Sequence, residues 1–177
     1  MKKLAIINTL SIVLLIIVMC CSLSACFDGV IEEKQFFRVM TSIQYYPSNY
    51  TDLTLELDCF TYKLVDVQGK EYICGVRKCS SGYGCTCGND TIIGFVLEYD
   101  GEVPAPKNQS VDTNDKTWVH LSGKVKSAEK IKIEINSYLP DGTVDTSKTE
   151  KIEFLVFAVE SLDLIADYSN LNYYVTD

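Results

Sequence analysis

The sequence predicts a mainly β domain with one N-terminal helix, folded as a small Greek-key barrel. Apolar and polar residues alternate through several segments after residue 52, which is the period of strands with one buried face. One earlier segment instead has apolar residues at the three- and four-residue spacing of a helix. Gly, Pro and Asn separate the alternating segments, as turn residues do. An eight-stranded sandwich is the alternative arrangement of such strands.

The first 25 of the 177 residues have the pattern of a secretory signal peptide. Lys2 and Lys3 precede a long apolar run that ends at Leu23. Because Leu4–Leu23 reaches the roughly 20 residues that a spanning helix needs, an uncleaved anchor is the alternative. The next residues favour cleavage, since Leu23-Ser24-Ala25-Cys26 resembles the lipobox of bacterial lipoproteins. That resemblance implies that Cys26 becomes the lipidated N-terminus.

The expected organisation is a signal peptide at 1–25, a lipidated N-terminus and short tether at 26–30, the barrel domain at 31–165 and a polar tail at 166–177. Cleavage removes two of the 16 basic residues and none of the 24 acidic ones. A chain this acidic has no electrostatic footprint for nucleic acid or for an anionic bilayer. We therefore expect attachment through lipid, on the extracytoplasmic face of the cell membrane, and a membrane-protein partner is compatible with that place.

One short amphipathic helix is predicted within Ile31–Tyr46. Phe36, Met40 and Ile43 lie on one face of it, and Glu32 and Glu33 stand near its start, where the helix dipole favours acidic residues. Pro47-Ser48-Asn49 ends the helix.

The first strand begins after Asp52 and changes phase within its length. Its apolar residues occupy odd positions up to Cys59 and then shift by one residue at Phe60. Such a shift predicts a bulge or a sharp coil that lets one strand serve two sides of a barrel. Gln68-Gly69 then predicts a turn into a second strand, Glu71–Lys78.

The remaining strands follow from the same alternation. We expect a third strand at Thr91–Tyr99, a long exposed connection at 100–116 and a fourth strand at Thr117–Lys126. An added hairpin is expected from Lys130–Asn136 and Lys151–Val159, followed by a closing strand at Val159–Ile165. Gly94 and Gly123 are expected to bend their strands, and Asp141-Gly142 to turn the hairpin. This order fits a barrel of the OB type.

Six segments carry a family resemblance: Phe36–Met40, Tyr46–Tyr50, Leu53–Leu55, Gly84–Asp90, Gly94–Leu97 and Trp118–Gly123. Through them the chain resembles small uncharacterised OB-fold lipoproteins of Gram-positive bacteria. It is similar as well to the C-terminal domain of a family of membrane permease subunits, which implies a link to transition-metal handling. The chain departs from these relatives where Thr86 separates Cys85 from Cys87 and where Lys130–Glu150 looks like an insertion.

The cysteines of the mature chain allow two interpretations. Besides Cys26 there are five, an odd number that cannot all pair within one molecule. In an oxidising compartment two disulfides and one thiol are expected, with Cys59 and Cys74 as candidates on the arms of the first hairpin. The other interpretation is a zinc site, since four thiolates close a tetrahedral one. The cysteines that would build either the brace or the metal site are Cys74, Cys79, Cys85 and Cys87.

No residue pattern predicts an active site, and we expect a binding or accessory module that is not an enzyme. His120 is the sole histidine and has no Ser or Cys motif with it, so a satisfied structural histidine is expected. Two alternatives stay open: a thiol-active protein using Cys85 and Cys87, and a structural envelope lipoprotein without a ligand. A binding face is expected to be lined by tyrosines, namely Tyr45, Tyr46, Tyr50, Tyr62 and Tyr83.

Overall fold

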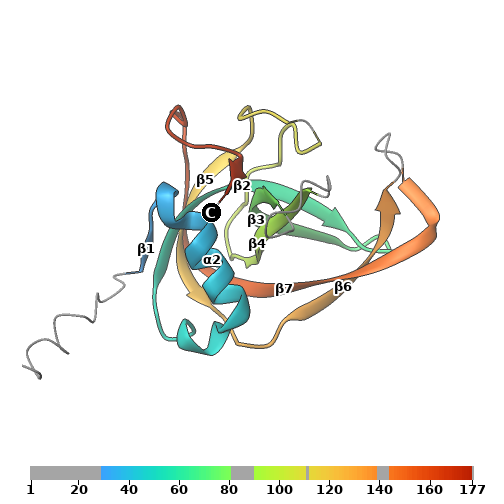
Figure 1. The fold of residues 1–177 in the computed structure, drawn as a ribbon, viewed down its shortest axis with the longest axis horizontal. Coiled ribbons are helices and arrows are strands. Elements are labelled where there is room, and N and C mark those ends of the chain that lie inside the picture. The colour runs from blue at the N-terminus through green and yellow to red at the C-terminus, as the bar shows by residue number, and fades with distance from the viewer. Residues whose placement is uncertain (1–28, 81–89, 111, 139–143, 177) are drawn as a thin grey trace, which may run out of the picture.

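The computed structural model describes residues 29–80, 90–110, 112–138 and 144–176. Within these ranges the chain is mainly β, with one α-helix, α2 (Phe36–Tyr45), and two 3-10 turns, η1 (Glu33–Gln35) and η2 (Pro47–Asn49). The strands are β1 (Val30–Ile31), β2 (Leu55–Val65), β3 (Glu71–Ser80), β4 (Asp90–Glu98), β5 (Trp118–Val125), β6 (Ile131–Tyr138), β7 (Val144–Leu164) and β8 (Tyr174–Val175) (Figure 1). The predicted class, mainly β with one helix, is confirmed.

The described strands form one connected mixed sheet whose central ladder returns to its starting strand. β2 pairs with β5, β5 with β7, β7 with β4, β4 with β3, and β3 again with β2. Most of these pairs are antiparallel, but β4 and β7 run parallel. The two short end strands add two more parallel pairs, because β1 pairs with β2 and β8 pairs with β3.

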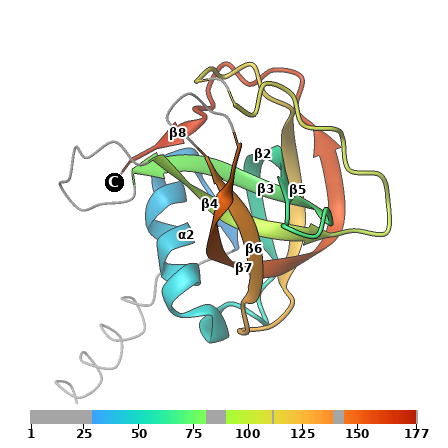
Figure 2. The ribbon, with the colours of Figure 1, turned by 90° about the vertical axis from the view of Figure 1, so that its right-hand side faces the viewer.

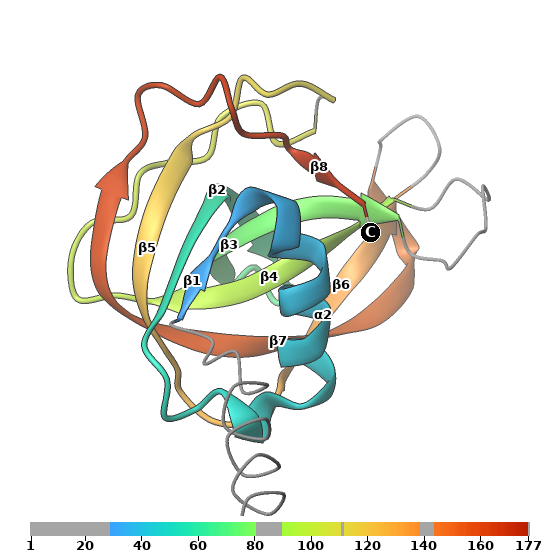
Figure 3. The same cartoon turned by 60° about the vertical axis from the view of Figure 1, so that its left-hand side comes forward.

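The helix packs on the sheet through the face that the sequence predicts. Phe36, Met40 and Ile43 are buried in a first apolar cluster, where Phe95 of β4 stacks on Phe157 of β7 at 5.0 Å between ring centroids. Figure 3 shows α2 lying beside β1, with β4 and β7 passing behind it. The helix is shorter than the expected Ile31–Tyr46. Ile31 belongs to β1 instead, because its backbone pairs with β2.

The predicted change of phase in the first strand is confirmed. Leu55, Leu57 and Cys59 of β2 are buried in the first apolar cluster, whereas Phe60 and Leu64 are buried in a second one. The partners explain the change: residues 55–60 pair with β5 and residues 60–65 with β3. One strand therefore contributes to two cores on opposite faces of the sheet.

The second core lies under the hairpin formed by β6 and the first half of β7. Ile133, Ile135 and Phe154 from this hairpin pack against Phe60, Val76 and Trp118, and Val67 beyond β2 donates its N–H to the carbonyl of Glu134 at 2.9 Å. Figure 1 shows β6 and β7 running out together to one side, and Figure 2 views them from that side. The two strands predicted at 151–165 are one, β7, because β6 pairs with its first half and β5 with its second.

The end of the chain is packed. Residues 166–176 fall within the segment predicted to be a polar tail, but β8 pairs with β3 and Val175 is buried in the first cluster. Tyr168, Leu171 and Tyr173 pack against the second cluster. None of the helices in the described ranges has the length and apolar character needed to cross a bilayer.

Candidate functional site: the Arg77 network and the Asp58–His120 pair

The most elaborate polar site of the described residues surrounds Arg77 of β3, whose side chain is buried. Its guanidinium donates to both carboxylate oxygens of Glu33, at 2.9 Å from Nη1 and 2.7 Å from Nη2. Nε and Nη2 donate to the carbonyl of Asp58 at 3.1 and 2.9 Å, and Nη1 also donates to the carbonyl of Asn172. An arginine side chain has five N–H donors, so this one is fully satisfied inside the protein.

Two aromatic rings complete the surroundings of Arg77. The Phe36 ring lies 4.7 Å and the Trp118 ring 4.6 Å from the guanidinium carbon. A desolvated guanidinium over aromatic faces is worth about 2 kcal/mol or more per contact. Because every donor is occupied, we interpret Arg77 as a structural centre rather than as a binder of an external anion.

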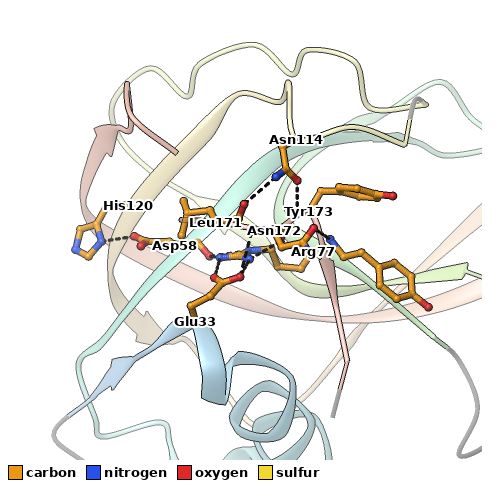
Figure 4. A network of polar contacts seen from close by, with 9 residues as sticks. Glu33, Asp58, Arg77, Asn114, His120, Leu171, Asn172 and Tyr173 are labelled. Atoms are coloured by element: carbon orange, nitrogen blue, oxygen red, sulfur yellow. Dashed lines mark hydrogen bonds and ion pairs between the residues drawn. The ribbon is translucent and has the colours of Figure 1, made fainter. Parts of the chain in front are cut away.

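The network joins segments that are far apart in the sequence (Figure 4). Glu33 Oε1 also accepts from the backbone N–H of Asn172 at 3.1 Å. Asn114, in the connection between β4 and β5, donates to the carbonyl of Leu171 and accepts from the N–H of Tyr173, both at 2.9 Å. The first and last segments of the described chain are therefore held together at Arg77.

Asp58 extends this network to the surface of the sheet. Its carboxylate lies 2.7 Å from Nδ1 of His120, and both side chains are about 38% exposed. In the strand pairing, His120 of β5 lies opposite Asp58 of β2 on one side and opposite Asp163 of β7 on the other. It therefore has an acidic residue next to it on each neighbouring strand.

A carboxylate that orients one imidazole nitrogen is also the arrangement of a catalytic triad. Triad chemistry needs a hydroxyl or thiol nucleophile bonded to the same imidazole. Within the described residues His120 has a hydrogen bond to Asp58 and none to a Ser, Thr or Cys side chain. The pair is therefore a histidine with a satisfied partner, as the sequence predicts.

The register argues against a disulfide between Cys59 and Cys74. Cys74 pairs with Tyr62, three positions along β2 from Cys59, which corresponds to about 10 Å along the strand. A disulfide requires Cα atoms within about 7 Å. The two thiols also belong to different apolar clusters, and neither forms a disulfide. Burial raises the pKa of each thiol to about 12.

The proposed set of four metal-binding cysteines is not brought together either. Cys74 and Cys79 point to opposite faces of β3, into different clusters, and are separated by about 16 Å of strand. Two thiolates on one zinc ion lie within about 4.6 Å of each other, because each Zn–S bond is about 2.3 Å. Cys85 and Cys87 lie outside the described residues. Among the residues that are described, no group of three His, Cys, Asp or Glu side chains is placed to hold a metal ion.

The tyrosines expected on one binding face are dispersed. Tyr45 and Tyr46 are exposed at the end of α2, and Tyr50 shares a 2.8 Å hydrogen bond with Ser42 of the helix. Tyr62 packs at the edge of the second cluster, and Tyr83 lies outside the described residues. The expected face is covered by the β6–β7 hairpin, which the sequence predicted as an added hairpin but not as a cover for this face.

Sequence reasoning missed the Arg77 network. The available signal was Arg77 itself, an arginine at a position of β3 that shares its face with Gly75 and Cys79, where burial is expected from alternation. A buried charge requires a partner, which would have prompted a search for Glu33. No protein-family model, no curated protein and no solved structure matches this chain.

Proposed function

We propose that this chain is a lipid-anchored extracytoplasmic accessory module that works beside a membrane-protein partner. The observation that carries the proposal is Leu23-Ser24-Ala25-Cys26 directly after an apolar run. The start of the fold agrees with it, because the carbonyl of Gly29 already accepts from the N–H of Glu56 at 2.8 Å. Only two residues separate Cys26 from this first sheet contact.

An OB-like Greek-key barrel is our proposal for the domain. Its support is the ring of pairings among β2, β3, β4, β7 and β5, together with a long connection between β4 and β5. Five strands closed in a Greek-key order are the composition of an OB barrel.

The accessory role is favoured over small-molecule binding because apolar side chains of the protein itself cover the face of the sheet where a ligand would bind. OB barrels bind ligands on the face of their second and third strands. In this chain the corresponding strands, β3 and β4, contribute Cys74, Val76 and Val96 to the apolar cluster under the β6–β7 hairpin. A cleft between β4 and β7, at Gly94 and Phe154, has a volume of about 230 Å³. Ligand pockets usually measure about 300 to 1,000 Å³.

The anchor is tested by expressing the full chain in a bacterium that processes lipoproteins and determining its N-terminus by mass spectrometry. We expect Cys26 carrying a diacylglyceryl group in the membrane fraction, and Cys26→Ser to lose both the cleavage and the modification. Cys21→Ser is the matched control, because this cysteine lies within the apolar run and should be processed normally. An unmodified Cys26 in the parent chain would refute the anchor.

A further inference from the structure

Two large aromatic side chains project from the end of α2. Tyr45 is 76% exposed and Tyr46, its C-terminal cap, is 64% exposed, with the two ring centroids 6.5 Å apart. Tyrosine has an apolar ring and a polar hydroxyl, so it is suited to surfaces that are apolar on one side and wet on the other. It is enriched at the headgroup level of membranes for that reason.

The tyrosine pair lies at one end of the molecule. The α2–η2 turn and the connection between β5 and β6 lie side by side at this end in every view, below the rest of the fold (Figures 1 to 3). The connection 99–117 and residues 166–173 lie at the opposite end (Figure 3). The described chain also starts toward the tyrosine end, since β1 runs parallel to β2 and pairs with the beginning of that strand.

The tether limits how far this end can lie from a lipid on Cys26. Three residue steps separate Cys26 from Gly29, and an extended chain spans at most about 3.6 Å per residue, or roughly 11 Å in all. Gly29 is fixed to the sheet by the hydrogen bond from Glu56. A lipid on Cys26 therefore holds the start of β1 within roughly 11 Å of its point of attachment.

Charge at the same end is compatible with a phospholipid surface. The segment from Lys124 to Lys130 contains three lysines and one glutamate, although the whole chain has a net charge of −8. Lys126 is exposed and forms an ion pair with Glu98 at 2.6 Å. Glu98 and Glu129 offset two of these three lysines, so the segment keeps a small positive charge. This charge weakens the electrostatic repulsion between this end of an acidic chain and an anionic bilayer.

From these four observations we infer that Tyr45 and Tyr46 insert into the headgroup region of the bilayer and fix the orientation of the domain. The inference rests on the anchor proposed above. The anchor supplies proximity, and the tyrosine pair selects which side of the domain faces the lipid. The 99–117 connection and the C-terminal segment then face away from the bilayer, toward a partner.

The experiment uses the lipidated full chain reconstituted in vesicles of phosphatidylglycerol and phosphatidylcholine with brominated acyl chains. Tyr46→Trp places a fluorescent reporter in the pair, and the native Trp118, 1% exposed, gives the baseline. Leu164→Trp is the matched control, because Leu164 has nearly the same exposure, 63%, at the far end of β7. We expect brominated lipid to quench the emission of Trp at 46 and shift it to the blue, and to leave Trp at 164 unchanged.

Flotation of the same vesicles separates the two proposals. If the parent chain floats with the vesicles but emission at 46 is not quenched, or is quenched no more than at 164, the anchor stands and the orientation is refuted. If the parent chain does not float, or Cys26→Ser floats equally well, the proposed anchor fails and the orientation inferred from it fails with it.

Discussion

At the scale of single residues, Arg77 determines how the ends of the chain are held. Five hydrogen bonds and two ring contacts replace the water that this guanidinium loses on burial. Burying a charge is costly, and the cost is recovered only where geometry and hydrogen bonding are both good. Removing only one member of the ion pair should therefore destabilise the fold more than replacing both members with apolar residues.

Replacement of Glu33 by glutamine is expected to destabilise the fold. It removes the carboxylate that Arg77 faces and leaves a buried cation without a counter-ion, which costs about 3 to 5 kcal/mol when both partners are buried. Because Glu33 is 35% exposed, we expect about 2 kcal/mol. Chemical denaturation of the variant measures this loss.

Glu71→Gln is the control for that experiment. It breaks the ion pair of Glu71 with Lys63, which is 2.9 Å long and exposed on both sides, whereas the pair of Glu33 with Arg77 has bonds of 2.7 and 2.9 Å and a buried arginine. Exposed pairs contribute about 1 kcal/mol or less. Equal losses for the two variants would contradict the structural role given to Arg77.

Two of the three buried cysteines in the described chain, Cys59 and Cys74, give the stability an alkaline dependence. Burial raises the pKa of Cys59 and of Cys74 from 9.0 to about 12, so the folded chain keeps protons that the unfolded chain releases. Their contribution to stability is complete below pH 9 and is lost as the pH rises toward 12. Each thiol should lower the free energy of unfolding by about 1.4 kcal/mol per pH unit in that range.

The slope is measured by denaturant unfolding at several pH values between 8 and 11. Cys74→Ala is expected to be less stable than the parent at pH 8 and to lose stability less steeply above pH 9. Cys59 and Cys74 should also resist alkylation in the folded chain at pH 8, because the thiolate is the reactive form. Rapid alkylation of either without denaturant would show that it is not buried as described.

At the scale of elements, two strands change their pairing partners along their length. β2 turns from β5 to β3 at Phe60, and β7 turns from β6 to β5 and β4 near Phe154. The β6–β7 hairpin contributes three of the nine buried residues of the second apolar cluster, Ile133, Ile135 and Phe154. The hairpin is thus part of the core of the protein, although in sequence it looks like an insertion.

Phe154→Ala tests the hairpin as a core element. Truncating a buried phenylalanine costs about 3 to 5 kcal/mol, because apolar contacts are lost and a cavity remains. Trp118 lies in the same cluster, so its emission should shift to the red as water approaches. Val144→Ala is the control, since Val144 is 50% exposed at the start of the same strand and its truncation should cost about 0.5 kcal/mol or less. If the hairpin were not part of the core, both variants would lose similarly small amounts of unfolding free energy.

At the scale of the whole molecule, the ends of the described chain meet. Glu33 precedes α2, and Asn172 follows the last long strand, yet both contact Arg77. β8 then adds to the edge of β3, and Val175 enters the core. Folding to this state requires the first and last segments of the described residues to come together.

A chain ending at Ile165 is expected to be strongly destabilised. It lacks the buried Val175 and the packed Leu171 and Tyr173, and each such side chain contributes about 1.5 to 3 kcal/mol when fully buried. A chain ending at Val175 keeps these contacts and serves as the control. Thermal unfolding and limited proteolysis should distinguish the two. A normal melting temperature for the chain ending at Ile165 would contradict the packing of this segment.

The signal pattern, the helix face, most strand segments and the change of phase in β2 could be predicted from the amino-acid sequence alone. These depend on the order of neighbouring residues, because helix and strand periods are local properties. Arg77 was not identified in this way, because its partners Asp58, Glu33 and Asn172 lie 19, 44 and 95 residues away.

Four features follow from the folded arrangement instead: the partners of Arg77, the opposite faces of Cys74 and Cys79, the continuity of β7 as one strand, and the packing of the C-terminal segment. Each depends on strand register, and a shift of one residue reverses every side chain on a strand. Register is fixed by contacts between segments far apart in the chain, which local patterns do not contain. That is why the cysteine cluster looked like a single site in sequence, while folding directs Cys59 and Cys79 to one core and Cys74 to the other.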